Sequence, residues 1–165
     1  MKKPTVYLET TIAGYLAGRR SRDIVVLAHQ ELTHIWWENH SSRFRLYTSE
    51  IVLQEAQMGD IDAAARRMSY LAGIPLIAVN EKVRELAVLY MTELGFPKKA
   101  LIDALHLAIS VHSAMDYLLT WNCTHLANEI FQRRLVKTNN SLSHHTPLIV
   151  TPENLIQEEG RGIEC

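Results

Sequence analysis

Short apolar runs alternate along the chain with longer segments in which apolar residues recur at helical spacing. The short runs have the length and residue types of buried strands, and they occupy residues 4–8, 44–49, 74–79, 116–121 and the start of 146–156. The longer segments predict helices over residues 24–40, 49–57, 59–73, 80–95, 96–115 and 124–140. Strands that alternate with helices predict an α/β fold, in which helices cover both faces of a parallel sheet.

Residues at the ends of these segments support the helix predictions. Ser49, Asn80 and Thr124 are suitable N-caps, because their side-chain oxygens can accept bonds from the first free backbone N–H groups. Gly73 and Gly95 suit the helix ends, where a residue in the left-handed conformation often follows the last turn. After the fifth strand we expect a Thr-Pro turn and one last helical turn.

Length and composition fit one globular domain. The chain has 165 residues, of which 47% are hydrophobic and 21% are charged, so it can bury a sizeable core and is too apolar for a disordered chain. We expect a single domain over residues 1–157 and a flexible C-terminal tail over residues 158–165. No repeat, low-complexity tract or linker divides the sequence.

Charge and cysteine content only partly constrain the partners and the cellular location of the protein. The net charge of −1 neither predicts nor excludes a nucleic-acid partner, because a local basic face can lie on a neutral protein. The N-terminus lacks the apolar run of a signal peptide, and no segment approaches the length of a membrane span. Cys123 and Cys165 form no CxxC motif and no dense disulfide framework. We therefore expect a soluble, reduced, cytoplasmic protein with no membrane contact.

Polar residues with oxygen ligands lie near the carboxyl ends of predicted strands. Glu9 directly follows the first strand, Asn122 follows the fourth, and Glu55 lies on the helix after the second. Asp103 lies in the first turns of the helix over 96–115, among apolar neighbours. Ligands of parallel α/β sheets bind beyond the carboxyl ends of the strands. A buried carboxylate is costly unless it is partnered, and a hard divalent cation is a suitable partner. The sequence therefore predicts an acidic metal site.

Each of these residues also has a purely structural interpretation. Glu9 can cap the helix that follows it, and Glu55 can be an ordinary surface residue. Asp103 can pair with a neighbouring lysine or with His106, which lies one helical turn away. Asn122 can simply form an Asx turn. The coincidence of all four with strand ends favours a site more than any single residue does.

Four segments resemble the successive motifs of PIN-domain ribonucleases, with the closest similarity to VapC-like toxins of type II toxin–antitoxin pairs. They are VYLETTIAGYL (6–16), SEIVLQEA (49–56), LIDALHLAIS (101–110) and DYLLTWNCTHLAN (116–128). The similarity covers about residues 5–156. It implies a three-layer α/β fold with a parallel sheet in strand order 3-2-1-4-5. It also implies Mg²⁺ or Mn²⁺ as cofactor, hydrolysis of RNA phosphodiesters, a homodimer and an antitoxin protein as partner.

The resemblance also assigns roles to positions of this sequence. The catalytic and metal-binding residues it implies are Glu9, Glu55, Asp103 and Asn122, and the supporting hydroxyl residues are Thr11 and Thr120. Two positions depart from the family pattern, since Glu9 replaces the usual first aspartate and Asn122 replaces an acid. The site then has three formal carboxylates instead of four. An alternative function is therefore a catalytically impaired PIN-fold module that binds RNA or a partner protein.

Other charged and aromatic residues carry less specific signals. Candidate RNA phosphate contacts are Arg19, Arg20, Lys98 and Lys99, which can equally form solvated surface. The eight histidines form no HExxH or Cys/His zinc pattern, and we expect His125 to cap or pack locally. A third interpretation is an unrelated small α/β domain whose acids are helix caps.

Overall fold

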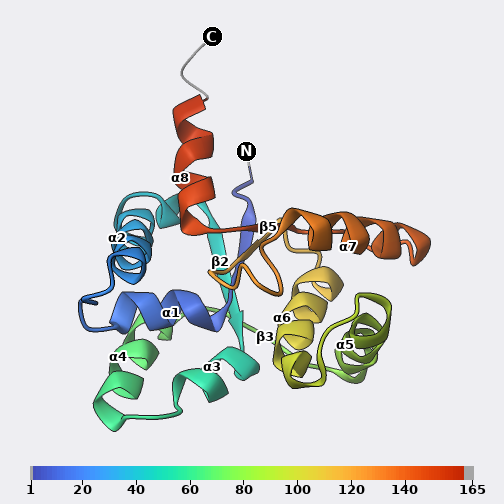
Figure 1. Ribbon diagram of the computed structural model, residues 1–165, viewed down its shortest axis with the longest axis horizontal. Helices are drawn as coiled ribbons and strands as arrows, with labels where there is room; N and C mark the ends of the chain where they lie inside the picture. Colours follow the sequence, from blue (N-terminus) through green and yellow to red (C-terminus); the bar gives the residue numbers. More distant parts are fainter. Residues whose placement is uncertain (1, 162–165) are drawn as a thin grey trace.

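The computed structural model describes residues 2–161, and within them five strands form one parallel sheet (Figure 1). The strands are β1 (Thr5–Leu8), β2 (Arg45–Ser49), β3 (Leu76–Ile77), β4 (Tyr117–Leu119) and β5 (Leu148–Val150). Their order across the sheet is β3-β2-β1-β4-β5, and every neighbouring pair is parallel. This confirms the predicted fold class and strand order. The central strand, β1, leads directly into Glu9.

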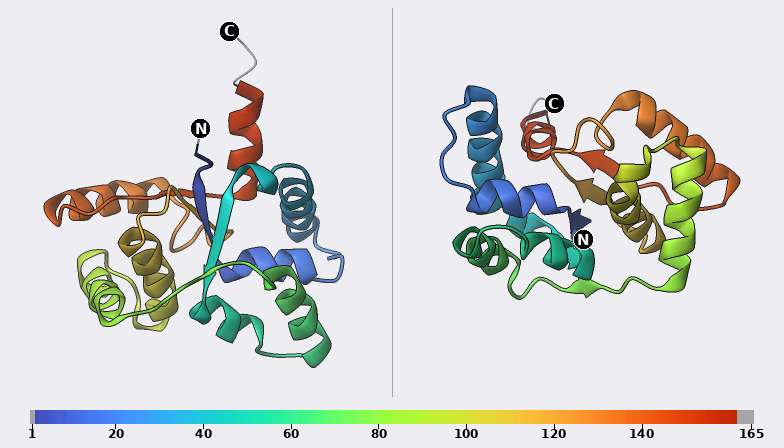
Figure 2. Two further views of the ribbon diagram at one scale, coloured as in Figure 1. Left: turned by 180° about the vertical axis from the view of Figure 1, so that it is seen from behind. Right: turned by 60° about the horizontal axis from the view of Figure 1, so that its bottom comes forward.

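Helices cover both faces of this sheet (Figures 1 and 2). On one side lie α1 (Thr10–Ala17), α2 (Ile24–Asn39) and α8 (Pro152–Arg161), and on the other lie α5 (Glu81–Glu93), α6 (Leu101–His112) and α7 (Glu129–Ser141). The remaining helices, α3 (Glu50–Ala56) and α4 (Ile61–Leu71), pack beside α1. Two short 3₁₀ turns, η1 (Ser41–Arg43) and η2 (Lys98–Ala100), complete the described elements. No helix among the described residues is both long and apolar enough to cross a membrane.

The alternation of side chains along β1 divides the interior into two cores. Val6 and Leu8 face one side, in a cluster that contains Trp36 of α2. Tyr7 faces the other side, in a cluster that contains Leu107 of α6. Successive residues of a strand point to opposite faces of the sheet, so a single strand buries apolar surface on both sides. All of β1 is buried, which places Glu9 at the centre of the fold.

Truncation of Leu107 is expected to destabilise the domain strongly. Its side chain is fully buried, and Leu→Ala changes at such positions cost about 2–5 kcal/mol. Leu101→Ala on the same helix is the matched control, because Leu101 is 44% exposed and should cost much less. Urea unfolding of both variants measures the difference. Equal losses of unfolding free energy would contradict the assignment of this core.

Several predicted boundaries are corrected by the structure. The helix predicted from residue 96 begins at Leu101, after η2. The helix predicted from Thr124 begins at Glu129, because Asn128 supplies the N-cap by accepting a 2.8 Å bond from Phe131 N. The last helix runs through Arg161, more than the expected single turn. It therefore extends into the segment that we expected to be a tail, of which residues 162–165, including Cys165, lie outside the described residues.

Other helix-end predictions are confirmed. Ser49 Oγ accepts a bond from Val52 N at 3.4 Å and caps α3, and Asn80 Oδ1 accepts one from Val83 N at 3.0 Å and caps α5. Gly73 and Gly95 follow the ends of α4 and α5 with φ of 78° and 69°, in the left-handed region that glycine adopts without strain.

Candidate functional site

Glu9 is a buried carboxylate at the carboxyl end of the central strand. Its side chain is only 5% exposed. Oε2 accepts hydrogen bonds from Thr11 N at 3.2 Å, from Thr11 Oγ1 at 2.5 Å and from Thr120 Oγ1 at 2.7 Å. The residue therefore caps α1, as the structural interpretation of the sequence proposed. The cap occupies Oε2 alone, and Oε1 lies 4.0 Å from His106 Nε2.

Thr11 and Thr120 both donate to Glu9 and both contact the loop after β4. Thr11 Oγ1 accepts from Trp121 N at 2.9 Å, and Thr120 Oγ1 accepts from Asn122 N at 2.9 Å. Each hydroxyl thus joins the end of β1 to the end of β4. The Glu9 carboxylate is held in one orientation by these two side chains.

Glu55 reaches the same place from α3. Its Oε1 lies 2.6 Å from the donor Thr10 Oγ1 and 2.7 Å from His106 Nε2. Glu9, Glu55 and His106 each offer one ligand atom, and these atoms all lie within 4.8 Å of one another. His106 is therefore part of the site, although the sequence suggested only local hydrogen bonding for it. The available signal was its place one turn after Asp103 on a helix whose other residues are mostly buried.

The His106–Glu55 pair changes the ionisation of both groups. Burial lowers the pKa of His106, but the hydrogen bond to Glu55 and the negative charges of Glu9, Glu55 and Asp103 outweigh it and hold the pKa above 6.5. Burial raises the pKa of Glu55, but the hydrogen bond and charge of His106 and the bond from Thr10 hold that pKa below 4.5. His106 and Glu55 thus stabilise each other's charged forms.

Asp103 and Asn122 meet at a different residue, His125. Asp103 Oδ2 lies 2.7 Å from His125 Nδ1, and Asn122 Oδ1 accepts a 3.0 Å bond from His125 N. The Asn122 side chain therefore bonds the turn that follows it, but three residues on and not two as in the expected Asx turn. Asp103 pairs with His125 rather than with a neighbouring lysine or His106. Asp103 supplies no ligand atom to the close group of Glu9, Glu55 and His106, although its charge acts on His106. The four predicted residues thus form two adjoining pairs.

The predicted phosphate contacts are all exposed but differ in position. Lys98 and Lys99 form η2, directly before the helix turn that carries Asp103. Arg19 and Arg20 follow the far end of α1, a helix of eight residues that is about 12 Å long. The lysines are therefore the better placed of the two pairs for contact with a ligand at the acidic residues.

The donor set fits a small divalent cation. Carboxylate oxygens are the ligands that Mg²⁺ and Mn²⁺ prefer, and Glu9 and Glu55 present them from two rigid elements. Glu9 is held by two hydroxyls and a backbone N–H, so it is preorganised for one position of a cation. The third formal carboxylate, Asp103, lies close enough for its charge to raise the pKa of His106.

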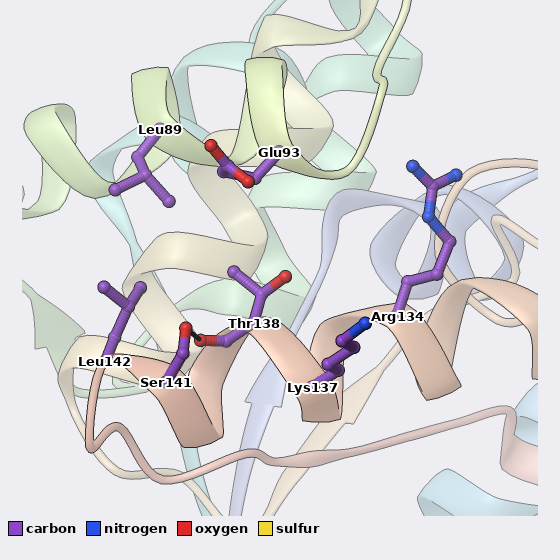
Figure 3. Close-up of a pocket in the computed structure, with 7 residues that line it drawn as sticks. All are labelled: Leu89, Glu93, Arg134, Lys137, Thr138, Ser141 and Leu142. Carbon is purple, nitrogen blue, oxygen red and sulfur yellow. Dashed lines mark hydrogen bonds between the residues drawn. The ribbon is translucent and has the colours of Figure 1, made fainter.

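A pocket of about 540 Å³ opens elsewhere, between α5 and α7 (Figure 3). Figure 3 shows Glu93 and Leu89 extending from α5 toward residues of α7. The residues that line this pocket are Leu89, Glu93, Arg134, Lys137, Thr138, Ser141 and Leu142. None of them belongs to the acidic group, so this pocket is not the candidate site.

Comparisons with known proteins agree at the level of the fold. No protein-family model matches the chain, and no curated protein sequence matches it. Solved structures similar to it include two toxin proteins. One is VapC20 of Mycobacterium tuberculosis, described as a sarcin-ricin loop cleaving toxin, with 14% identity, a TM-score of 0.57, and 72% of this chain and 91% of that chain covered.

The other similar structure is VapBC2 of Rickettsia felis, bound to a DNA fragment from its promoter. It has 16% identity and a TM-score of 0.52, and the match covers 89% of this chain and 98% of that chain. The strand order of this chain is the one that the family resemblance implied. The chain therefore has the PIN-domain fold of VapC toxins.

Proposed function

We propose that the protein is a metal-dependent endoribonuclease and the toxin of a toxin–antitoxin pair. The observation that carries the proposal is the pair of carboxylates Glu9 and Glu55 at the carboxyl edge of the sheet, with Glu9 almost fully buried and its ligand atom within 4.8 Å of the others. The PIN-domain fold supports the same assignment. In this proposal Glu9, Glu55, Asp103 and Asn122 surround Mg²⁺ or Mn²⁺.

A divalent cation at such a site lowers the pKa of water and neutralises charge on a phosphodiester. The protein's own contribution is to hold the carboxylates and the substrate phosphates in position. Thr11 and Thr120 hold the Glu9 carboxylate, and Glu55 is oriented by Thr10 and His106. Lys98 and Lys99 bind RNA phosphates beside Asp103, in contacts that weaken with salt and carry no sequence information.

The proposed partners follow from the toxin assignment. They are an RNA substrate in the cytoplasm, an antitoxin protein that covers the acidic residues, and a second copy of the chain in a homodimer. An antitoxin that neutralises the toxin would have to mask Glu9 and Glu55 or the two lysines, because these are the groups that meet cation and phosphate.

A second candidate function is an inactive PIN-fold module that binds RNA or a protein. A specific observation favours it. Asp103 and Asn122 are both bonded to His125, and neither belongs to the close group of Glu9, Glu55 and His106. If this arrangement persists in the presence of metal, Glu9 and Glu55 are the two carboxylates of the close group that would hold a cation.

Purified protein is expected to cleave a mixed RNA panel with Mn²⁺ or Mg²⁺ and to lose this activity in EDTA. Asp103→Ala should reduce the rate on the order of a hundredfold, because misplacement of about 1 Å in a catalytic site has that effect. The matched control is Asp62→Ala, which removes an exposed acid from α4. Cleavage that survives both EDTA and Asp103→Ala would indicate contamination, and no cleavage by folded protein would favour the binding module.

A further inference from the structure

A chain of buried polar groups runs from the end of β2 to Glu55. Tyr7 OH lies 2.8 Å from both Ser49 Oγ and His106 Nδ1, and His106 Nε2 lies 2.7 Å from Glu55 Oε1. We propose that His106, held by Tyr7 and Ser49, is the positioning residue that orients Glu55 toward the metal. This inference rests on the proposed metal-dependent function and adds residues to its site.

The hydrogen-bonded side chains of Tyr7, Ser49 and His106 are embedded in the apolar core. Tyr7, Ser49 and His106 are each fully buried, and His106 is flanked by buried Leu107. Buried polar groups are costly unless every one is hydrogen-bonded, and apolar residues of similar volume would fill the same space without that requirement. Core packing alone therefore does not explain why three polar side chains meet here.

Both ring nitrogens of His106 are engaged, which fixes the ring. Rotation about its side-chain bonds would break the contact with Tyr7, the contact with Glu55, or both. Burial raises the pKa of Tyr7, so its hydroxyl keeps its proton and serves as one donor and one acceptor. The Tyr7–Ser49 contact then sets the direction from which His106 is held.

The same three side chains also connect the strand and helices that carry the acidic residues. Tyr7 lies on β1, two residues before Glu9, and Ser49 caps α3, which carries Glu55. His106 lies on α6, one turn after Asp103. Figure 1 shows these three elements meeting at the same end of the sheet. A change at Tyr7 is thus expected to alter the relative position of the acidic groups without removing any of them.

Partners of this kind orient the groups that bind metal, and their loss costs about 10–100-fold in metal affinity or activity. Removal of the imidazole leaves Glu55 with Thr10 as its remaining side-chain partner. The carboxylate is one-third exposed and would then sample several orientations. Lys98 and Lys99 are not altered, so RNA binding through these exposed lysines should not change.

The test compares Tyr7→Phe, His106→Leu and His106→Gln with the control Tyr90→Phe. Tyr90 is also fully buried, and its change to phenylalanine removes the hydrogen bond to Asn139, where Tyr7→Phe removes the contacts with Ser49 and His106; Tyr90 lies on α5 and bonds to α7, away from the acidic residues. Mn²⁺ affinity by calorimetry, kcat and KM for RNA, and thermal stability are measured for each. We expect Tyr7→Phe to lose about 10–100-fold in Mn²⁺ affinity or kcat at unchanged KM. His106→Leu should show the same loss at a pH high enough for the wild-type imidazole to be neutral, where removal of its positive charge no longer favours the cation.

The control and the conservative variant make the result specific. Tyr90→Phe should keep wild-type affinity and kcat, and His106→Gln should recover part of the loss, because its amide can donate to Glu55. If His106→Leu does not fold, Tyr7→Phe carries the test, since it conserves volume. Folded Tyr7→Phe and His106→Leu proteins with wild-type Mn²⁺ affinity and kcat would overturn the inference.

Three outcomes separate the inference from the function on which it rests. Nitrogen coupling from labelled histidine in the pulsed EPR spectrum of bound Mn²⁺, absent in His106→Gln, would make His106 a metal ligand and overturn its positioning role. Wild-type protein that binds no Mn²⁺ and cleaves no RNA would overturn the proposed function and this inference together. Wild-type binding with unaffected variants overturns the inference alone.

Discussion

Replacement of Glu9 by glutamine is expected to lower metal-dependent RNA cleavage about a thousandfold. A metal ion contributes several kcal/mol of charge stabilisation in the transition state, and each 1.36 kcal/mol corresponds to about a factor of ten in rate. Glutamine keeps the size and one acceptor oxygen, so the bonds from Thr11 and Thr120 can persist. The variant therefore removes the charge while it leaves the cap of α1 in place.

Single-turnover cleavage and Mn²⁺ calorimetry on the same protein preparation measure this loss. The control is Glu93→Gln, which neutralises an exposed acid in the pocket between α5 and α7 and should leave both quantities unchanged. Wild-type cleavage by Glu9→Gln would show that Glu9 is only a helix cap, and the metal assignment would then fail.

Glu9→Asp should not raise the RNA-cleaving activity above that of the wild type, although the resemblance places aspartate at this position. Glu9 Oε2 reaches the hydroxyls of Thr11 and Thr120 at 2.5 and 2.7 Å, and Glu9→Asp withdraws the carboxylate by one methylene. This displacement exceeds about 1 Å, which in a catalytic site can cost on the order of a hundredfold. The surrounding hydroxyls are fitted to the longer side chain. A Glu9→Asp protein more active than wild type would contradict this interpretation.

The positions of Glu9 and Glu55 were predictable from the sequence because they depend on local rules. A strand that ends at Leu8 places the next side chain at the sheet edge, and Ser49 fixes the start of the helix that carries Glu55. Parallel strands bring both ends to the same edge. The strand order itself came from the family resemblance, since apolar periodicity does not say which strands are neighbours.

The partners of His106 were not predictable in the same way. Glu55 is 51 residues away and Tyr7 is 99 residues away, and neither separation leaves a periodic signal. The Asp103–His125 pair spans 22 residues for the same reason. The misplaced start of α7 has a local cause. Thr124 and Asn128 are both good caps, and the turn over 122–127 prevails because the Asn122 carbonyl accepts bonds from Leu126 N and Ala127 N.

The His106–Glu55 pair predicts a pH optimum for the stability of the metal-free protein. Glu55 has a lowered pKa, so its stabilisation is present above 4.5 and is lost as the pH falls through the folded-state value. His106 has a raised pKa, so its stabilisation is complete below 6.5 and is lost as the pH rises through the folded-state value. In EDTA, the contribution of the pair should therefore be largest between pH 4.5 and 6.5.

The proton that charges the His106 imidazole opposes metal binding. Glu9, Glu55, Asp103 and Tyr7 face His106, and with Tyr7 neutral the imidazolium is the positive charge that a cation would replace. If binding releases one proton, Mn²⁺ affinity should rise by up to about tenfold per pH unit until the pH passes the His106 pKa. Calorimetry between pH 5.5 and 8.5 measures the slope, and thermal unfolding in EDTA over a wider range measures the stability optimum.

His106→Gln is the control that isolates this effect, because its amide does not titrate and the other carboxylates remain. Subtraction of its pH profile from that of the wild type removes the general acid lability of the protein. The difference should show both the stability maximum and the rise in Mn²⁺ affinity. Identical profiles for the two proteins would mean that His106 does not change its charge across this range, and the expected proton-linked change in Mn²⁺ affinity would be wrong.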